Sequence, residues 1–341
     1  MKKIVFTLIA LFILCSSAQG ATHLYVANRT SVKYDGYFPQ INAKGNQVVF
    51  APTDAKKLYL YDLDTRNRTT ISEDGVPGFE ARFSEDGKVY YITTKANDNH
   101  LLFRSCHEYD PATGRDRVVL EPQHGAVHAI KGTDDIVAVG EQKDWNTKNG
   151  GTFAWALGNE LYIYVNGKKR VVKNPVPVQT GYLWVDVSPN GQKILFEVPA
   201  KGLYICDTKG KILNQLPACI MPSWYNDDVI IAQGRGKSYS YNIIAFRADG
   251  EGGIQSLASG SCTMPSVMGN KIVYTTKSGK ITIMTMETPE ERQIRLAKEA
   301  EERRKAEEAR KAEEEARKAE EARKAAEAAA AAEAQNNGSN Q

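Results

Sequence analysis

The sequence lacks the features that would place it in several large functional classes. Its 44 lysine and arginine residues are nearly balanced by 41 aspartate and glutamate residues, which leaves a formal net charge of +3. So small an excess indicates neither nucleic acid nor an anionic membrane as the partner. No apolar run is long enough to span about 30 Å of hydrocarbon, so we expect no transmembrane segment in the mature chain.

Motifs for common catalytic and metal sites are also missing. The sequence contains no Gly-x-Ser-x-Gly and no His-Glu-x-x-His, the patterns of many hydrolases and zinc peptidases. Its cysteines form no Cys-x-x-Cys pair, and no histidine stands at zinc-ligand spacing from one of them. These absences predict a protein without a metal, without a cofactor and without enzymatic activity.

The first residues have the pattern of an export signal. Lys2 and Lys3 precede an apolar run from Ile4 to Leu14, and Ala18-Gln19-Gly20 supplies small residues at a cleavage site. We therefore expect residues 1–20 to be a signal peptide and the mature chain to be periplasmic, with secretion or outer-membrane association as alternatives. Lipidation at Cys15 is disfavoured because Leu14 precedes it.

One phrase occurs twice: Cys219 and Cys262 each begin Cys-x-Met-Pro-Ser, about 43 residues apart, which is the length of one propeller blade. Related segments start near Phe38, Glu80 and Trp184. Each has a short alternating strand, a tight turn and a β-branched or aromatic strand. Gly45, Asp86-Gly87 and Asn190-Gly191 provide the positive φ angles that such turns require.

Counting these units predicts an all-β, six-bladed propeller with four-stranded blades over residues 21–287. The third unit, near Ala129, is degenerate in its first hairpin. The last unit lacks a fourth strand, while the segment from Thr22 is a strand without a unit of its own. A propeller ring must close, so we expect the N-terminal strand to complete the last blade.

The segments "FSEDGKVYYI" and "VSPNGQKILF", followed by "LYLYDLDTRN" or "EYDPATGRD", resemble the WD-like repeats of the TolB family. The resemblance covers most of residues 22–287 and implies a propeller in the bacterial cell envelope that binds other envelope proteins. The separate N-terminal α/β domain of that family is absent, so contacts made through that domain do not carry over.

The composition changes at Thr288. About 45 residues without glycine or proline follow, rich in Ala, Glu, Lys and Arg, and as a helix they would extend about 70 Å. Thr288 and Glu291 fit a capping box. We expect a solitary helix over 288–334 and a disordered tail over 335–341. Weak coiled-coil association and partner docking are the alternatives. The helix also resembles the spacer helix of TolA.

Two sets of residues are candidate binding sites. Alternation along the innermost strands directs one polar residue of five of the six blades toward the channel; the candidates are Gln40, Arg82, Asp186, Ser223 and Ser266. Aromatic residues outside the repeat pattern suit a binding surface; these are Trp145, Tyr182 and Tyr239. Cys219 and Cys262, at equivalent positions of adjacent blades, are candidates for a disulfide.

These features together predict an exported, non-enzymatic binding or scaffold protein of the cell envelope, with the helix as a spacer or tether. Envelope proteins are the expected partners, with glycan or peptidoglycan contact as a further expectation. The alternative is a propeller that binds a glycan or small ligand at the channel mouth, as a sensor or a lyase-like enzyme.

Overall fold

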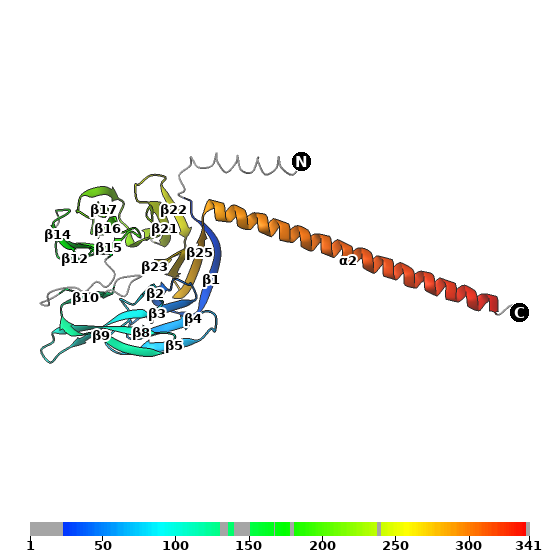
Figure 1. Cartoon of the computed structure of the whole chain (residues 1–341), viewed down its shortest axis with the longest axis horizontal. Helices are drawn as coiled ribbons and strands as arrows, with labels where there is room; N and C mark the ends of the chain where they lie inside the picture. The colour runs from blue at the N-terminus through cyan, green and yellow to red at the C-terminus, as the bar shows by residue number, and fades with distance from the viewer. Residues whose placement is uncertain are drawn as a thin grey trace. The chain divides into compact units, whose positions relative to one another are not determined.

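The structure is a computed structural model that describes residues 23–129, 136–139, 151–166, 168–177, 181–236 and 240–338. The chain divides into two units, Met1–Glu287 and Thr288–Gln341. The first unit is a six-bladed β-propeller and the second is one long helix (Figure 1). The predicted fold class is therefore confirmed.

Four blades are antiparallel sheets in which consecutive strands of the chain pair in order from the innermost to the outermost. Blade 1 contains β2 (Tyr37–Ile41), β3 (Gln47–Ala51), β4 (Leu58–Asp62) and β5 (Arg68–Ser72); blade 2 contains β6 (Arg82–Phe83), β7 (Val89–Ala96), β8 (Leu102–Asp110) and β9 (Arg115–His124). Blade 4 contains β15 (Leu183–Val187), β16 (Lys193–Val198), β17 (Gly202–Asp207) and β18 (Ile212–Leu216); blade 5 contains β19 (Ile220–Trp224), β20 (Val229–Arg235), β21 (Tyr241–Arg247) and β22 (Ile254–Ala258).

The third blade differs from the others, as its degenerate sequence predicts. Its described strands form a two-stranded sheet and a three-stranded sheet instead of one sheet of four. The strands are β10 (Ala126–Ala129) and β11 (Ile136–Val139), then β12 (Thr152–Leu157), β13 (Glu160–Val165) and β14 (Lys168–Lys173). Stacked aromatic pairs hold β12 to β13: Phe153 on Tyr164 at 4.8 Å and Trp155 on Tyr162 at 5.2 Å.

The sixth blade joins the two ends of the propeller sequence. Strands β23 (Thr263–Met268), β24 (Lys271–Thr275) and β25 (Lys280–Glu287) supply three members, and β1 (Tyr25–Asp35) pairs antiparallel with β25 as the fourth. Figure 1 shows β1 lying along β25. The N-terminal strand thus closes the ring, as the unmatched strand from Thr22 predicts.

The hydrophobic core lies between the blades. Val49 and Leu60 of blade 1, for example, form one buried cluster with Phe83 and Tyr91 of blade 2. Both faces of an inner blade strand are covered, so these strands read as nearly continuous apolar runs, and Val229 to Ala232 is entirely buried. Removal of these apolar surfaces from water is the main stabilising contribution to the ring.

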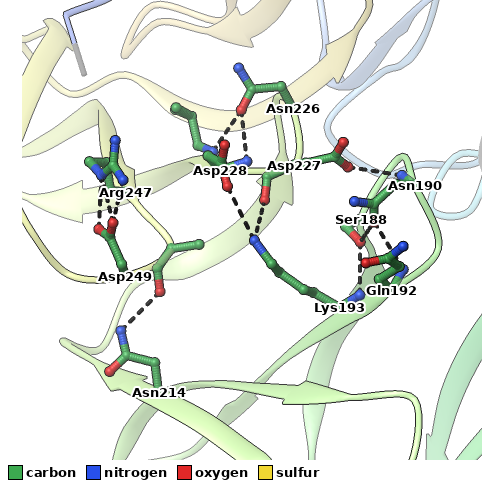
Figure 2. A network of polar contacts seen from close by, with 12 residues as sticks. Ser188, Asn190, Gln192, Lys193, Asn214, Asn226, Asp227, Asp228, Arg247 and Asp249 are labelled. Atoms are coloured by element: carbon green, nitrogen blue, oxygen red, sulfur yellow. Dashed lines mark hydrogen bonds and ion pairs between the residues drawn. The ribbon is translucent and has the colours of Figure 1, made fainter. Parts of the chain in front are cut away.

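The turns between the first two strands of blades 1, 2 and 4 are built as predicted. Gly45, Gly87 and Gly191 have φ angles of 74°, 88° and 71°, which residues with a Cβ rarely adopt. The turn of blade 4 also contacts blade 5 (Figure 2): Lys193 donates to the backbone oxygen of Asp227 at 2.9 Å, and the Asn190 amide donates to the Asp227 carboxylate at 2.9 Å. This polar network fastens adjacent blades at one end of the ring.

The second unit is helix α2 (Pro289–Gly338). The predicted capping box forms: the Glu291 amide donates to Thr288 Oγ1 at 3.2 Å, and the Thr288 amide donates to Glu291 Oε2 at 2.8 Å. The helix continues four residues past its predicted end at residue 334 into the segment that we expected to be disordered. No helix of the described chain is sufficiently long and apolar to span a membrane.

Candidate functional site

The innermost strands of four blades begin with the same irregularity. In β2, Tyr37 pairs with Ala51 of β3 and Gln40 pairs with Val49. The pairs are three residues apart in β2 but only two residues apart in β3. One extra residue is therefore inserted in the inner strand, which is the definition of a β-bulge. The same three-against-two register occurs at the starts of β15, β19 and β23. The bulge is part of the repeat.

A large apolar residue occupies the same position in each bulge. Phe38, Trp184, Met221 and Met264 have φ angles of 52°, 53°, 51° and 55°. This left-handed conformation costs a residue other than glycine about 1–2 kcal/mol. Backbone strain of this kind is often found at ligand-binding sites. Four bulky residues thus occupy positions where glycine would have no backbone strain. We therefore take the start of the innermost strands as a candidate site.

The bulges place apolar side chains at one mouth of the propeller, because blades related by rotation about one axis present equivalent positions at the same end. Trp184 is 42% exposed and Phe79, which precedes the inner strand of blade 2, is 53% exposed. The Phe38 ring lies 4.7 Å from Phe79, and the Phe38 amide donates to Met264 Sδ at 3.4 Å. We call Phe38, Phe79, Trp184, Met221 and Met264 the apolar rim.

Four of the five predicted channel residues lie two positions after the left-handed residue of a bulge, and the structure brings these four together in pairs. Ser266 Oγ donates to Gln40 Oε1 at 2.6 Å, which joins blade 6 to blade 1. Ser223 Oγ donates to Asp186 Oδ2 at 3.0 Å, which joins blade 5 to blade 4. These side chains hold neighbouring inner strands together, and their part in ligand binding stays a prediction.

Arg82, the fifth predicted channel residue, is partly buried and donates to the backbone oxygen of Ala81 at 2.8 Å. Burial lowers the pKa of its guanidinium, while the carboxylates of Glu80 and Asp186 act in the opposite direction. Arginine is not deprotonated in proteins, so the guanidinium remains charged despite this loss of hydration. Arg82 thus places a cation within electrostatic range of the Glu80 and Asp186 carboxylates.

Of the three predicted surface aromatics, the structure describes Tyr182 alone. Tyr182 is 7% exposed, so its prediction as a surface aromatic was wrong. Its ring meets Phe196 edge to face at 5.1 Å, and its hydroxyl donates to the backbone oxygen of Val176 at 2.6 Å. A satisfied hydroxyl lets tyrosine pack in a core. Trp145 and Tyr239 lie outside the described residues.

The predicted disulfide is not formed. Cys219 and Cys262 are both buried free thiols, and they belong to different clusters: Cys219 packs with Trp224 between blades 4 and 5, and Cys262 packs with Tyr274 between blades 5 and 6. Equivalent positions thus fall in successive blade junctions and do not meet at the axis. Burial raises the pKa of the Cys219 thiol to about 12, which suppresses the reactive thiolate.

Four polar side chains in blade 2 are arranged as carboxylate, imidazole and hydroxyl, the order found in a hydrolytic triad. His107 Nδ1 lies 3.6 Å from Asp116 Oδ2, and His107 Nε2 lies 3.3 Å from Ser105 Oγ and 3.2 Å from Thr93 Oγ1. Ser105 is only 7% exposed and Thr93 only 3%, so neither hydroxyl can reach a carbonyl of a substrate. The group links β7, β8 and β9.

Comparison with known proteins assigns no family to this chain. No protein-family model and no curated protein matches the sequence. The chain is similar to solved structures of acylaminoacyl peptidase. An orthorhombic crystal form of the Pyrococcus horikoshii enzyme is 13% identical over 70% of this chain and 41% of that chain, with a TM-score of 0.43. A complex with Z-Gly-Gly-Phe-chloromethyl ketone is 12% identical over 74% and 44%, with the same TM-score. The uncomplexed Pyrococcus horikoshii structure is 14% identical over 70% and 41%, again with a TM-score of 0.43.

Each matched structure is that of an enzyme, so the prediction that this chain is without enzymatic activity is withdrawn. The chain spans less than half the length of those chains. At 12–14% identity the likeness concerns the propeller fold alone and assigns neither a substrate nor a catalytic residue to this chain.

Proposed function

We propose that this chain is a protein-binding propeller of the TolB type, exported to the bacterial cell envelope, and that its partner docks on the apolar rim. The observation that carries the proposal is the repeated bulge, which holds Phe38, Trp184, Met221 and Met264 at one mouth in a left-handed conformation. In this reading, the cost in backbone energy is offset when a partner covers the side chains.

The composition of the rim supports a protein partner. Aromatic residues and methionine are enriched at protein interfaces, and tryptophan is a frequent anchor residue. Methionine also adapts its shape to different apolar surfaces. Leu183 and Ile220, each one residue before a bulge, are 47% and 38% exposed, so they enlarge the apolar area that a partner would bury.

The polar residues below the rim favour this reading over the glycan alternative. Ser266 bonds to Gln40 and Ser223 bonds to Asp186, so these groups already use hydrogen bonds that a sugar would need. The helix α2 would act as a spacer: a continuous helix of 50 residues extends about 75 Å.

Photo-crosslinking in the cell of origin tests the proposal. Benzoylphenylalanine placed at Trp184 or Phe79 should trap the same envelope protein. The double variant Trp184→Ser/Phe79→Ser should lose at least about 90% of its capture by affinity pull-down, as expected when anchor residues are truncated.

Leu213 and Ile254 provide the matched control. They are exposed to a similar extent, at 51% and 59%, but lie on the outermost strands β18 and β22. Leu213→Ser/Ile254→Ser should retain the partner. If the rim variant keeps the partner, or if the control loses it equally, the rim is not the docking surface.

A further inference from the structure

We propose that strand β14 is a second binding surface, which takes an extended acidic segment of a partner protein as an additional β-strand. The inference is independent of the function proposed for the apolar rim. It rests on the charge of this strand, on the backbone groups at its outer edge and on the contrast with the other outermost strands.

Cations cover β14. Lys168, Lys169, Arg170 and Lys173 are all exposed. A turn of blade 4 lies against the same strand, since a Cβ on Gly210 would approach Val172 Cγ2 to 2.6 Å. This turn adds the exposed Lys209 and Lys211. We call these six basic residues the basic edge; they are Lys168, Lys169, Arg170, Lys173, Lys209 and Lys211.

Few carboxylates of the described chain oppose this charge. Glu160 lies 3.7 Å from Lys173 and accepts the Tyr162 hydroxyl at 2.6 Å. Asp207 accepts the backbone amides of Lys209 and Lys211 within its own turn, at 2.8 and 2.9 Å. Among the described residues, the other five members of the basic edge form no ion pair. Their charges are available to an acidic ligand.

The outer edge of β14 also offers backbone hydrogen bonds. The Asn174 amide donates to the Asn159 oxygen at 2.9 Å, and hydrogen-bonded pairs alternate along an antiparallel ladder. Residues 168, 170 and 172 therefore bond to β13, whereas Lys169, Val171 and Lys173 direct their N–H and C=O groups outward. Among the described strands, β14 pairs with β13 only. An incoming strand can use these groups.

Lysine on an edge strand often prevents unwanted pairing, so the comparison with the other blades matters. β14 has four lysine or arginine residues and no carboxylate. Among the other outermost strands, β9 and β1 contain two lysine or arginine residues each, together with carboxylates in the same strand, β5 contains one, and β18 and β22 contain none. General protection of the edges would require cations there too. The concentration of charge on β14 instead fits a partner with carboxylates at alternate residues, since opposite charges on neighbouring strands attract.

A membrane or another polyanion would use the charges alone, whereas a peptide strand needs the charges and the outward backbone. Val171→Pro separates the two. It removes an N–H that β13 does not use and is tolerated on the solvent side of an edge strand. Val171→Thr is its matched control. Lys168→Glu/Arg170→Glu reverses the charge, with Lys44→Glu/Lys277→Glu, two exposed lysines on blades 1 and 6, as its control.

The experiment measures binding of a fluorescent peptide that alternates glutamate and valine, by anisotropy, to the full mature chain. In parallel, vesicles of phosphatidylcholine and phosphatidylglycerol are tested by co-sedimentation. Wild-type protein and both controls should bind the peptide. Val171→Pro and the charge-reversal variant should each weaken binding at least about tenfold, with unchanged thermal unfolding.

Three results would overturn the proposal. In the first, the wild-type chain fails to bind the peptide. In the second, Val171→Pro binds the peptide as tightly as Val171→Thr does, which would mean that charge alone is recognised. In the third, the vesicles bind wild type and Val171→Pro equally while the peptide does not bind. The last result would assign the basic edge to an anionic lipid surface.

Discussion

Met264 illustrates the backbone strain that the repeated bulge imposes on a single residue. It sits at φ 55°, is partly buried, and its amide donates to Gln233 Oε1 of the neighbouring blade at 3.1 Å. The backbone is thus held in an unfavourable conformation by contacts on both sides. If so, the usual preference for alanine over glycine in a strand should be inverted at this position.

We therefore expect Met264→Gly to be more stable than Met264→Ala by about 1 kcal/mol, because both remove the side chain and only glycine relaxes the left-handed backbone. Urea unfolding of the two variants measures the difference. Met268, in the same strand and without a positive φ angle, is the control, where alanine should be the more stable. Equal stability of the two Met264 variants would mean that the bulge stores no strain.

Glu108 is a buried carboxylate that ties three strands of blade 2. Tyr90 donates to it at 2.5 Å, and Arg117 donates through two nitrogens at 2.8 and 2.9 Å. The hydrogen bonds from Arg117 hold the pKa of Glu108 below its ordinary value. A depressed carboxyl pKa stabilises the fold above the ordinary pKa, and this stabilisation is lost as the pH falls through the folded value.

Glu108→Gln should cost about 1–2 kcal/mol at neutral pH, since it weakens hydrogen bonds to a charged group. The difference from wild type should shrink as the pH falls below about 4. Urea midpoints at several pH values provide the measurement, with the exposed Glu121→Gln as control. A difference that is the same at neutral and at acid pH would rule out ionisation of Glu108 as its source.

At the scale of elements, β1 is the strand on which closure depends. Along β25 it fills the place that an outer strand of the same unit would occupy, and Val32 of β1 is 2% exposed in the cluster with Ile281 and Ile283. Without β1, the full length of β25 would be an unprotected edge.

A chain that begins at Tyr37 should therefore aggregate or melt at least about 10 °C lower than the mature chain, which corresponds to a loss of several kcal/mol for a domain of this size. A synthetic peptide of residues 23–35 added during refolding should restore the melting temperature, whereas a scrambled peptide should not. Normal melting without any peptide would show that the blade is stable with three strands.

Much at this scale was predictable, since hairpin glycines and alternating apolar strands are local signals. Gly45, Gly87 and Gly191 identified three turns, and the unmatched strand near Thr22 identified the closure. The bulges escaped prediction because a left-handed methionine has no distinct local signature. The repeated Met-Pro-Ser phrase was the available clue.

Tertiary contacts explain the remaining errors. Tyr182 precedes an inner strand as a surface aromatic would, but its hydroxyl finds a backbone partner in Val176, which no periodicity reveals. Cys219 and Cys262 are equivalent in the repeat, yet equivalence fixed only their positions in successive blades and not the distance between them.

At the scale of the whole molecule, two units of different chemistry share one chain. The propeller is stabilised by buried clusters between blades, whereas α2 is stabilised by its cap and by ion pairs between Glu and Lys one turn apart. Three of these are Glu307–Lys311, Glu314–Lys318 and Glu320–Lys324, at 2.8–2.9 Å. Exposed pairs of this kind contribute only tenths of a kcal/mol each.

A chain that ends at Glu287 should consequently keep the melting temperature of the propeller within about 2–3 °C, which for a domain of this size corresponds to less than about 1 kcal/mol. Helical circular dichroism should fall in proportion to the residues removed. Differential scanning calorimetry makes the comparison, with the full mature chain as reference. A large drop in melting temperature would show that α2 contributes to the stability of the propeller.

The pairing of β1 with β25 has a consequence for the order of events in folding. Tyr25 begins the first strand of the propeller, and its partner Glu287 ends the last one. Contacts so distant in sequence form slowly because a long loop must close. The other blades can assemble from contacts within their own segments, but the ring stays open until β1 and β25 pair. The first strand therefore waits the longest for its partner, and the open ring is the stage at which chaperones and proteases have access to the chain.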